Sequence, residues 1–155
     1  MTIVVVLKFL NFLEYRWLNK KILKSRVWDL NICCGKQDGG GINADIKKYV
    51  DLPNFTQISD IYHLPFTDKQ FENVLCAHTM EHVARPEDFY KELTRVGKNV
   101  TLVLPPVWDL GAVLDILEHK WIFLTWRVKF NHLPKYIKLP LADWWQKRFG
   151  QTLKA

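Results

Sequence analysis

The chain has 155 residues, of which 48% are hydrophobic and 25% are charged. This composition excludes a disordered or low-complexity chain, and the length suits one domain that buries its own core. The net charge is +6. Residues 1–116 contain 14 basic and 14 acidic residues, whereas residues 117–155 contain 8 basic and 2 acidic ones. The whole excess of positive charge therefore lies in the C-terminal segment.

The N-terminal segment is predicted to form a helix over residues 8–24. Residues 3–13 are nearly all apolar, and several basic residues follow them. This apolar stretch is too short to span a membrane, and it lacks the basic region and the cleavage site of a signal peptide. The pattern favours a helix that packs on the domain with a basic outer face. A helix lying at a membrane interface is the alternative.

The central part of the chain is predicted to alternate strands and helices. Apolar runs bounded by Gly, Pro and Asn predict strands, and Pro86 suits the first turn of a helix. Strands are expected over residues 26–33, 42–46, 55–59, 71–77 and 99–104, with a turn at 36–41, a loop at 64–68 and a helix over 85–95. This order predicts an α/β fold with a mostly parallel sheet. About eight residues separate the first two strands, which is too few for a crossover helix.

The C-terminal part is predicted to begin with a helix at 109–118. One or two strands are expected within 121–130, and irregular structure with a short helix at 143–149 follows. Four tryptophans accompany the basic residues of this part: Trp121, Trp126, Trp144 and Trp145. Such a surface suits nucleic acid, an anionic membrane surface or an acidic substrate, and the composition does not choose among them. A solvated basic edge beside core tryptophans is the plainer interpretation.

The cysteines indicate a reducing environment. Cys33, Cys34 and Cys76 make an odd number with no framework spacing, and adjacent cysteines rarely bridge each other. We therefore expect free thiols and a cytoplasmic protein. Peripheral attachment to a membrane through the N-terminal helix is the alternative. The sequence gives no indication of the oligomeric state.

Four landmarks follow one another along half of the chain. They are Asp-Leu-Asn-Ile-Cys-Cys-Gly at 29–35, Ile-Asn-Ala-Asp-Ile at 42–46, Ser-Asp-Ile-Tyr-His-Leu-Pro-Phe at 59–66, and His-Thr-Met-Glu-His-Val at 78–83. In this order they resemble the class I S-adenosylmethionine-dependent methyltransferases, which are seven-stranded and Rossmann-like, and within that class a short branch. The resemblance implies a reduced methyltransferase fold and methyl transfer from S-adenosylmethionine to an unidentified acceptor.

The resemblance also implies an organisation of the chain and a set of cofactor-binding residues. A single domain over 1–155 would comprise an N-terminal helix (1–25), a cofactor-binding core (26–106) and a basic, Trp-rich C-terminal extension (107–155). Gly35 would let the backbone approach the cofactor, Asp45 would accept the ribose hydroxyls, and Asp60 would accept the adenine amino group. The other residues expected to line the site are Asn31, Cys33, Ile46 and Ile61.

Two departures from the family pattern lie in the first landmark. Cys33 stands at the usual first glycine, and Asn31 stands at the usual acid. A cysteine there is expected to narrow the pocket and to avoid the backbone angles of glycine. These departures support a second hypothesis, in which the chain is a non-catalytic binding module that contacts nucleic acid or a membrane through its basic C-terminal segment.

His78 is the candidate catalytic residue, because it follows the fourth strand where the methyl group would lie. A histidine there can remove a proton from an acceptor near neutral pH, or it can simply shape the pocket. Residues 78–82 also read His-x-x-Glu-His, a zinc-protease pattern when it lies on a helix. A strand leads directly into these residues and no third ligand is evident, so the sequence predicts no metal site.

Overall fold

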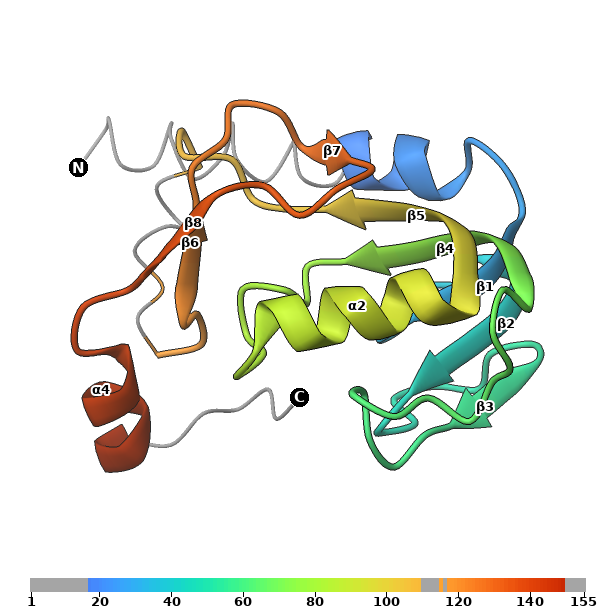
Figure 1. Cartoon of the computed structure of the whole chain (residues 1–155), viewed down its shortest axis with the longest axis horizontal. Coiled ribbons are helices and arrows are strands. Elements are labelled where there is room, and N and C mark those ends of the chain that lie inside the picture. Colours follow the sequence, from blue (N-terminus) through green and yellow to red (C-terminus); the bar gives the residue numbers. More distant parts are fainter. Residues whose placement is uncertain (1–16, 110–114, 116, 150–155) are drawn as a thin grey trace.

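The computed structural model describes residues 17–109, 115 and 117–149. Six strands form the main sheet in the order β3-β2-β1-β4-β5-β7 (Figure 1). Their bounds are β1 (Trp28–Ile32), β2 (Gly40–Asp45), β3 (Phe55–Gln57), β4 (Phe71–Ala77), β5 (Gly97–Val103) and β7 (Lys129–Phe130). The strands β1 to β5 are parallel and β7 is antiparallel to β5. The predicted α/β fold with a mostly parallel sheet is therefore confirmed.

The two faces of the sheet are covered by different helices. Helix α2 (Pro86–Val96) connects β4 to β5 and buries Phe89, Leu93 and Val96 in the main core. Residues 17–23 are helical and contribute to a smaller core around Trp28 on the sheet (Figure 1). The helix predicted over 8–24 is thus confirmed over 17–23, and its first nine residues lie outside the described ranges.

The connection from β1 to β2 is a loop over residues 33–39, as the short spacing predicted. The two strands are direct parallel neighbours, and Trp28 pairs with Gly40. The backbones approach so closely that a Cβ atom added to Gly41 would lie 2.3 Å from the carbonyl oxygen of Trp28. Gly40 and Gly41 therefore belong to the strand, which begins two residues earlier than predicted.

A small second sheet lies beyond the carboxyl ends of β4 and β5, on the left in Figure 1. It consists of β6 (Trp121–Phe123) and β8 (Tyr136–Lys138), which pair antiparallel, and helix α4 (Ala142–Phe149) follows. The predicted strands within 121–130 and the terminal helix are confirmed, whereas β8 replaces expected irregular structure. The helix predicted at 109–118 falls largely on residues 110–114 and 116, which are outside the described ranges.

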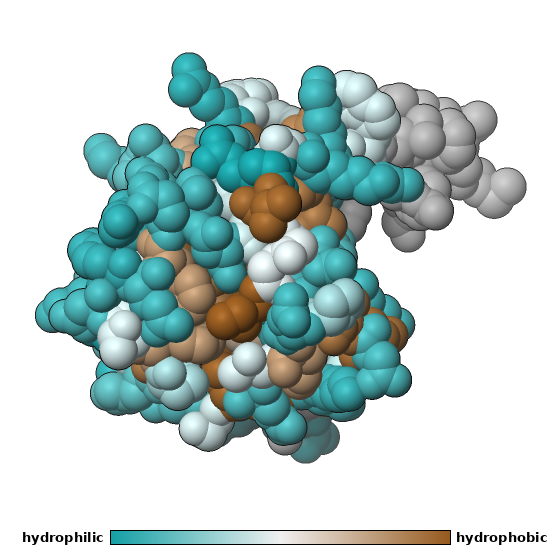
Figure 2. Space-filling view, turned by 90° about the vertical axis from the view of Figure 1, so that its right-hand side faces the viewer, coloured by the Kyte–Doolittle hydropathy of each residue, from teal (hydrophilic) through white to brown (hydrophobic). Residues whose placement is uncertain are grey.

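The opposite end of the sheet, where the strands begin, is mostly hydrophilic. Figure 2 shows this side, with apolar side chains visible only in patches between polar ones. On the edge of β5 away from β4, strand β7 pairs only with Leu102 and Val103, so no strand of the described part of the chain pairs with residues 97–101 on that edge. Within the described ranges, none of the helices has the length and apolar character needed to cross a membrane.

Candidate functional site

A pocket of about 320 Å³ opens at the carboxyl ends of β1, β2 and β4. In parallel α/β sheets, ligands bind at this edge. Five of the eight predicted site residues meet in it: Asn31, Cys33, Gly35, Asp45 and His78. The remaining lining residues are Cys34, Lys36, Gln37, Tyr49, Ala77, Thr79 and His82. The pocket thus joins the first, second and fourth sequence landmarks.

The turn after β1 has an unusual backbone. Cys33 has a φ of 54° and Gly35 a φ of 56°, both in the left-handed region that favours glycine. The expectation that Cys33 avoids glycine-like angles is therefore wrong, and its backbone takes the conformation at a cost of roughly 1 kcal/mol. A Cβ atom added to Gly35 would meet nothing within 4 Å, so this backbone borders open space.

Asp45 fastens this turn to the end of β2. Its buried carboxylate accepts a hydrogen bond from the Gly35 amide at 2.8 Å through Oδ2, and one from the Lys47 amide at 3.3 Å through Oδ1. Each carboxylate oxygen has a second lone pair. Asp45 can therefore hold the turn and still accept a hydroxyl group in the pocket.

Asn31 belongs to a buried amide network that supports the loop to β2. Its Nδ2 donates to the Gln37 carbonyl at 2.8 Å and to Asn43 Oδ1 at 3.1 Å. Asn43 in turn donates to Asp38 Oδ1 at 2.9 Å. Asn43 and the Gly40 amide hold the pKa of Asp38 below its ordinary value. Sequence reasoning missed Asn43, and its only signal was its place beside Asp45 in the second landmark.

His78 follows β4 directly and has a left-handed backbone, with φ at 51°. Both ring nitrogens have oxygen partners: Nε2 lies 3.0 Å from Asn19 Oδ1, and Nδ1 lies 3.5 Å from Glu81 Oε1. Burial raises the pKa of Glu81, but the hydrogen bond from His78 and the nearby histidine charges outweigh it, so the net pKa is lowered. The buried Glu81 carboxylate therefore orients the imidazole beside the pocket.

Three predicted residues do not line this pocket. Ile61 is buried in the main core, and Ile46 is half-buried against it. Asp60 accepts hydrogen bonds from the Tyr62 amide and from His63 Nδ1, both at 2.8 Å, and these bonds lower its pKa. The third landmark thus forms a local loop, and the adenine role of Asp60 remains a prediction.

Residues 78–82 form turns and not a helix, which removes the basis of the zinc-protease hypothesis. Instead, the backbone of Glu81 is bound to a distant segment. The amides of Lys120 and Trp121 donate to the Glu81 carbonyl at 2.7 and 3.2 Å. The indole of Trp121 also donates to the Val83 carbonyl at 2.8 Å. The turn after β4 is therefore held by the beginning of β6.

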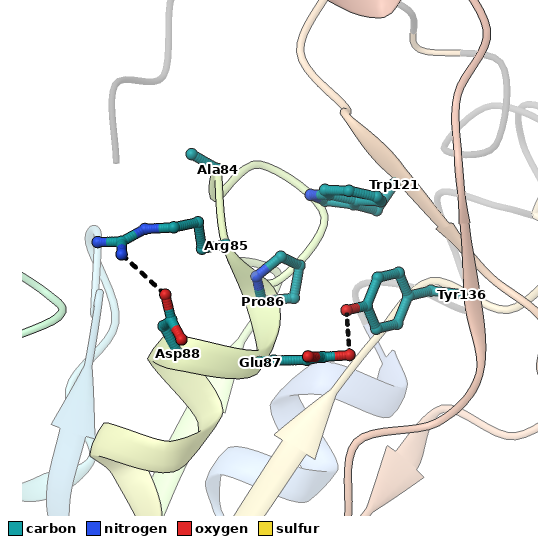
Figure 3. A pocket seen from close by; sticks show the side chains of 7 residues that line it. All are labelled: Ala84, Arg85, Pro86, Glu87, Asp88, Trp121 and Tyr136. Carbon is teal, nitrogen blue, oxygen red and sulfur yellow. Dashed lines mark hydrogen bonds and ion pairs between the residues drawn. The ribbon is translucent and has the colours of Figure 1, made fainter.

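A second pocket, of about 290 Å³, lies where the start of α2 meets the small sheet (Figure 3). The rings of Trp121 and Tyr136 lie on the same side of Pro86, and the Tyr136 hydroxyl donates to Glu87 Oε1 at 3.1 Å. Arg85 pairs with Asp88 at 2.8 Å on the other side of Pro86. Sequence reasoning did not predict this pocket, because it joins residues about 50 positions apart.

The C-terminal aromatic residues divide into two groups. Trp126 is 76% exposed and Trp144 is 57% exposed. Trp121 and Trp145 are half-buried. The segment therefore combines packed aromatic rings with exposed ones. All three cysteines are free, as the sequence predicted.

A family model described as a methyltransferase domain matches residues 25–103, about half of the chain. No curated protein matches the chain. Among solved structures, the YcgJ protein from Bacillus subtilis is 21% identical, with a TM-score of 0.44 over 58% of this chain and 50% of that one. An S-adenosylmethionine-dependent methyltransferase from Aquifex aeolicus is 19% identical, with a TM-score of 0.44 over 72% of this chain and 82% of that one.

A third solved structure is the complex of the Trm112 methyltransferase activator from Haloferax volcanii with a putative methyltransferase. It is 16% identical, with a TM-score of 0.44 over 61% of this chain and 55% of that one. The chain thus spans about half the length of two of these three proteins.

Proposed function

Because the chain belongs to the methyltransferase-domain family, we propose that it transfers a methyl group from S-adenosylmethionine to an acceptor. The pocket after β1, β2 and β4 is the proposed cofactor site. The observation that carries this proposal is the convergence of five residues, chosen for their order in the sequence, on one pocket at the carboxyl edge of the sheet.

The residues present fit this cofactor. The pocket volume of about 320 Å³ falls within the usual range of small-molecule sites. The left-handed turn at Gly35 leaves room for a ligand against the backbone, and the buried Asp45 carboxylate retains lone pairs for ribose hydroxyls. When bound, the cofactor supplies a methyl group on a positively charged sulfur.

In this proposal the chain contributes positioning and one proton acceptor. Methyl transfer is an in-line displacement, so holding the two reactants in line supplies much of the rate. His78 lies in the pocket wall, with Glu81 orienting its ring. We propose that an acceptor hydroxyl or amine replaces Asn19 at Nε2. With the ring proton on Nδ1 facing Glu81, the lone pair of Nε2 takes the proton of the acceptor. A His78→Gln variant should bind the cofactor normally and lose most of the turnover.

The cofactor site is tested by calorimetric titration of the full chain with S-adenosylmethionine and S-adenosylhomocysteine. Asp45→Ala should weaken binding by about 1–3 kcal/mol, because polar groups lose their partner. The matched control is Asp51→Ala, since Asp51 is exposed, pairs with Lys48 and lies outside the pocket. Unchanged affinity in Asp45→Ala would contradict the assignment of Asp45.

The second candidate function is a binding module without catalysis. The strained Cys33 and the direct bond from the Gly35 amide to Asp45 favour it, because both occupy the turn that a cofactor must approach. A folded chain that binds neither nucleoside would support this module. The exposed aromatic and basic residues of 117–149 would then be its contact surface. Titration with an oligonucleotide and with anionic vesicles at several salt concentrations tests that surface.

A further inference from the structure

Three buried side chains with metal-binding atoms converge behind the pocket. Glu81 and His82 lie in the turn after β4, and His119 lies just before β6. Their potential ligand atoms all lie within 4.8 Å of one another. The exposed fractions are 1% for Glu81, 7% for His82 and 8% for His119. Three such groups in a buried space call for a physical explanation, because buried ionisable groups are costly unless something pairs with them.

The carboxylate of Glu81 is incompletely paired. Its Oε1 faces His78 Nδ1 at 3.5 Å, whereas its buried Oε2 has no hydrogen-bond partner among the described residues. Buried carboxylate oxygens are nearly always bonded to a donor or to a cation. Glu81 Oε2 therefore offers a lone pair in a place that water does not reach freely.

The tautomer of His82 suits a ligand as well. Its Nδ1 lies 2.9 Å from the Glu118 carbonyl oxygen, which can only accept, so Nδ1 carries a proton. In the neutral ring the lone pair then lies on Nε2. A backbone carbonyl that holds the second nitrogen of a histidine is the usual support of a metal-binding histidine. The His119 ring stands edge-on to the His82 ring, with centroids 4.7 Å apart.

Backbone hydrogen bonds bring these groups together, alongside the contact of His82 with the Glu118 carbonyl. The Lys120 and Trp121 amides bind the Glu81 carbonyl, and Gln146 Nε2 donates to the His119 carbonyl at 3.0 Å. The bonds from the Lys120 and Trp121 amides join the two segments, and a substitution at the Glu81 or His119 side chain would leave them in place. The site is preorganised, and removal of one ligand should not unfold it.

We propose that Glu81, His82 and His119 bind one divalent transition-metal ion, with Zn²⁺ the best fit. Two imidazoles and one carboxylate form a donor set of zinc sites that keep a fourth position open. The nitrogen donors disfavour Ca²⁺ and Mg²⁺, which take oxygen ligands. His119 is the third ligand that the sequence pattern lacked, and His78 is not part of the set.

The ion would join the turn after β4 to the segment before β6 on the side where His82 faces the pocket. This proposal does not depend on methyl transfer, because the donor set and its support stand without a cofactor. An ion at this position would fix one wall of the pocket in either of the two functions considered above.

The test is a calorimetric titration of the chelator-treated full chain with Zn²⁺ alone, alongside visible spectra with Co²⁺. We expect one ion per chain and a higher midpoint of thermal unfolding. Substitution of a residue that only supports a metal ligand typically lowers metal affinity by about 10–100-fold. His119 is a proposed ligand itself, so His119→Ala should weaken zinc binding by at least about 100-fold. His132→Ala is the matched control, because that histidine is exposed and outside the cluster.

A second variant, Glu81→Gln, keeps the shape of the side chain and removes its charge. Without metal it should still fold, and zinc should no longer raise its unfolding midpoint. Absence of zinc binding to the folded native chain would overturn the proposal. So would full affinity in His119→Ala, or cobalt spectra with thiolate bands, because both would place the ion elsewhere. Titration with S-adenosylhomocysteine in the same samples tests the cofactor site separately.

Discussion

The turn after β1 and the turn after β4 border the same pocket, but different parts of the chain hold them in place. The first is fastened by Asp45, ten residues from the Gly35 amide that it binds. The second is fastened by Lys120 and Trp121, about 40 residues from the Glu81 carbonyl. One wall of the pocket is thus local in sequence, whereas the other depends on the C-terminal segment. This difference predicts that the two walls respond separately to substitutions.

The largest effect is expected from Trp121→Ala. The indole is half-buried and donates to the Val83 carbonyl. It packs edge-on against the Tyr136 ring, with the two ring centroids 5.1 Å apart. Its loss should lower the free energy of unfolding by about 2–3 kcal/mol in urea denaturation. Amide hydrogen exchange should quicken at residues 81–83 and stay unchanged at Gly35.

Trp126→Ala is the control, because that indole is 76% exposed, and it should change stability by no more than about 0.5 kcal/mol. Equal effects of the two substitutions would mean that Trp121 does not hold the turn. Faster exchange at Gly35 in Trp121→Ala would mean that the two walls are coupled.

A smaller effect is expected from the strained residue of the first turn. Cys33→Gly and Cys33→Ala both remove the thiol, and they differ only in how well they accept the φ of 54°. Glycine takes this angle without steric cost, so Cys33→Gly should be more stable than Cys33→Ala by about 1 kcal/mol. Thermal unfolding of the pair measures this difference. Equal stability would show that the turn relaxes to an ordinary backbone angle.

The smallest effect concerns Cys34 and pH. Burial, and then the charge of Asp45, raises the pKa of the Cys34 thiol from 9.0 to about 12. The folded chain keeps this proton where the unfolded chain loses it, so the thiol's contribution to stability falls as pH rises from 9.0 towards 12. Alkylation of Cys34 by iodoacetamide at pH 9 should therefore be much slower in the folded chain than in urea. Asp45→Asn should modestly speed the alkylation of Cys34 in the folded chain. An unchanged rate would exclude the Asp45 charge as a cause of the raised pKa.

The sequence predicted the structural features that depend on neighbouring residues and on the order of the strands along the chain. Strand β4 has the bounds that its apolar run suggested, because a loop precedes the run and a turn follows it. The position of Asp45 beside the Gly35 turn followed from the parallel order of β1 and β2. The loop between these strands was also predicted, because the sequence between them is too short for a crossover helix.

Long-range contacts could not be predicted in this way. Strand β8 exists because residues 136–138 pair with β6, and a run of three residues carries too weak a pattern to indicate that pairing. His119 owes its place to tertiary contacts with no motif around it. Asn43 lies within the second landmark, but the landmark does not indicate its hydrogen bond with Asn31. The backbone angle of Cys33 also went against the preference of the residue, since the closure of the turn outweighs a cost of roughly 1 kcal/mol.

The uncovered edge of β5 has a consequence for how copies of this chain meet. Residues 97–101 present backbone groups that another strand could bind, which is a route to aggregation. This stretch carries Lys98 and Asn99, both exposed, and Lys98 pairs with Glu72 on the neighbouring strand at 2.8 Å. A lysine on an open edge repels an incoming strand, because pairing would bury its charge. We therefore expect Lys98 to disfavour pairing of this edge with a strand of another molecule.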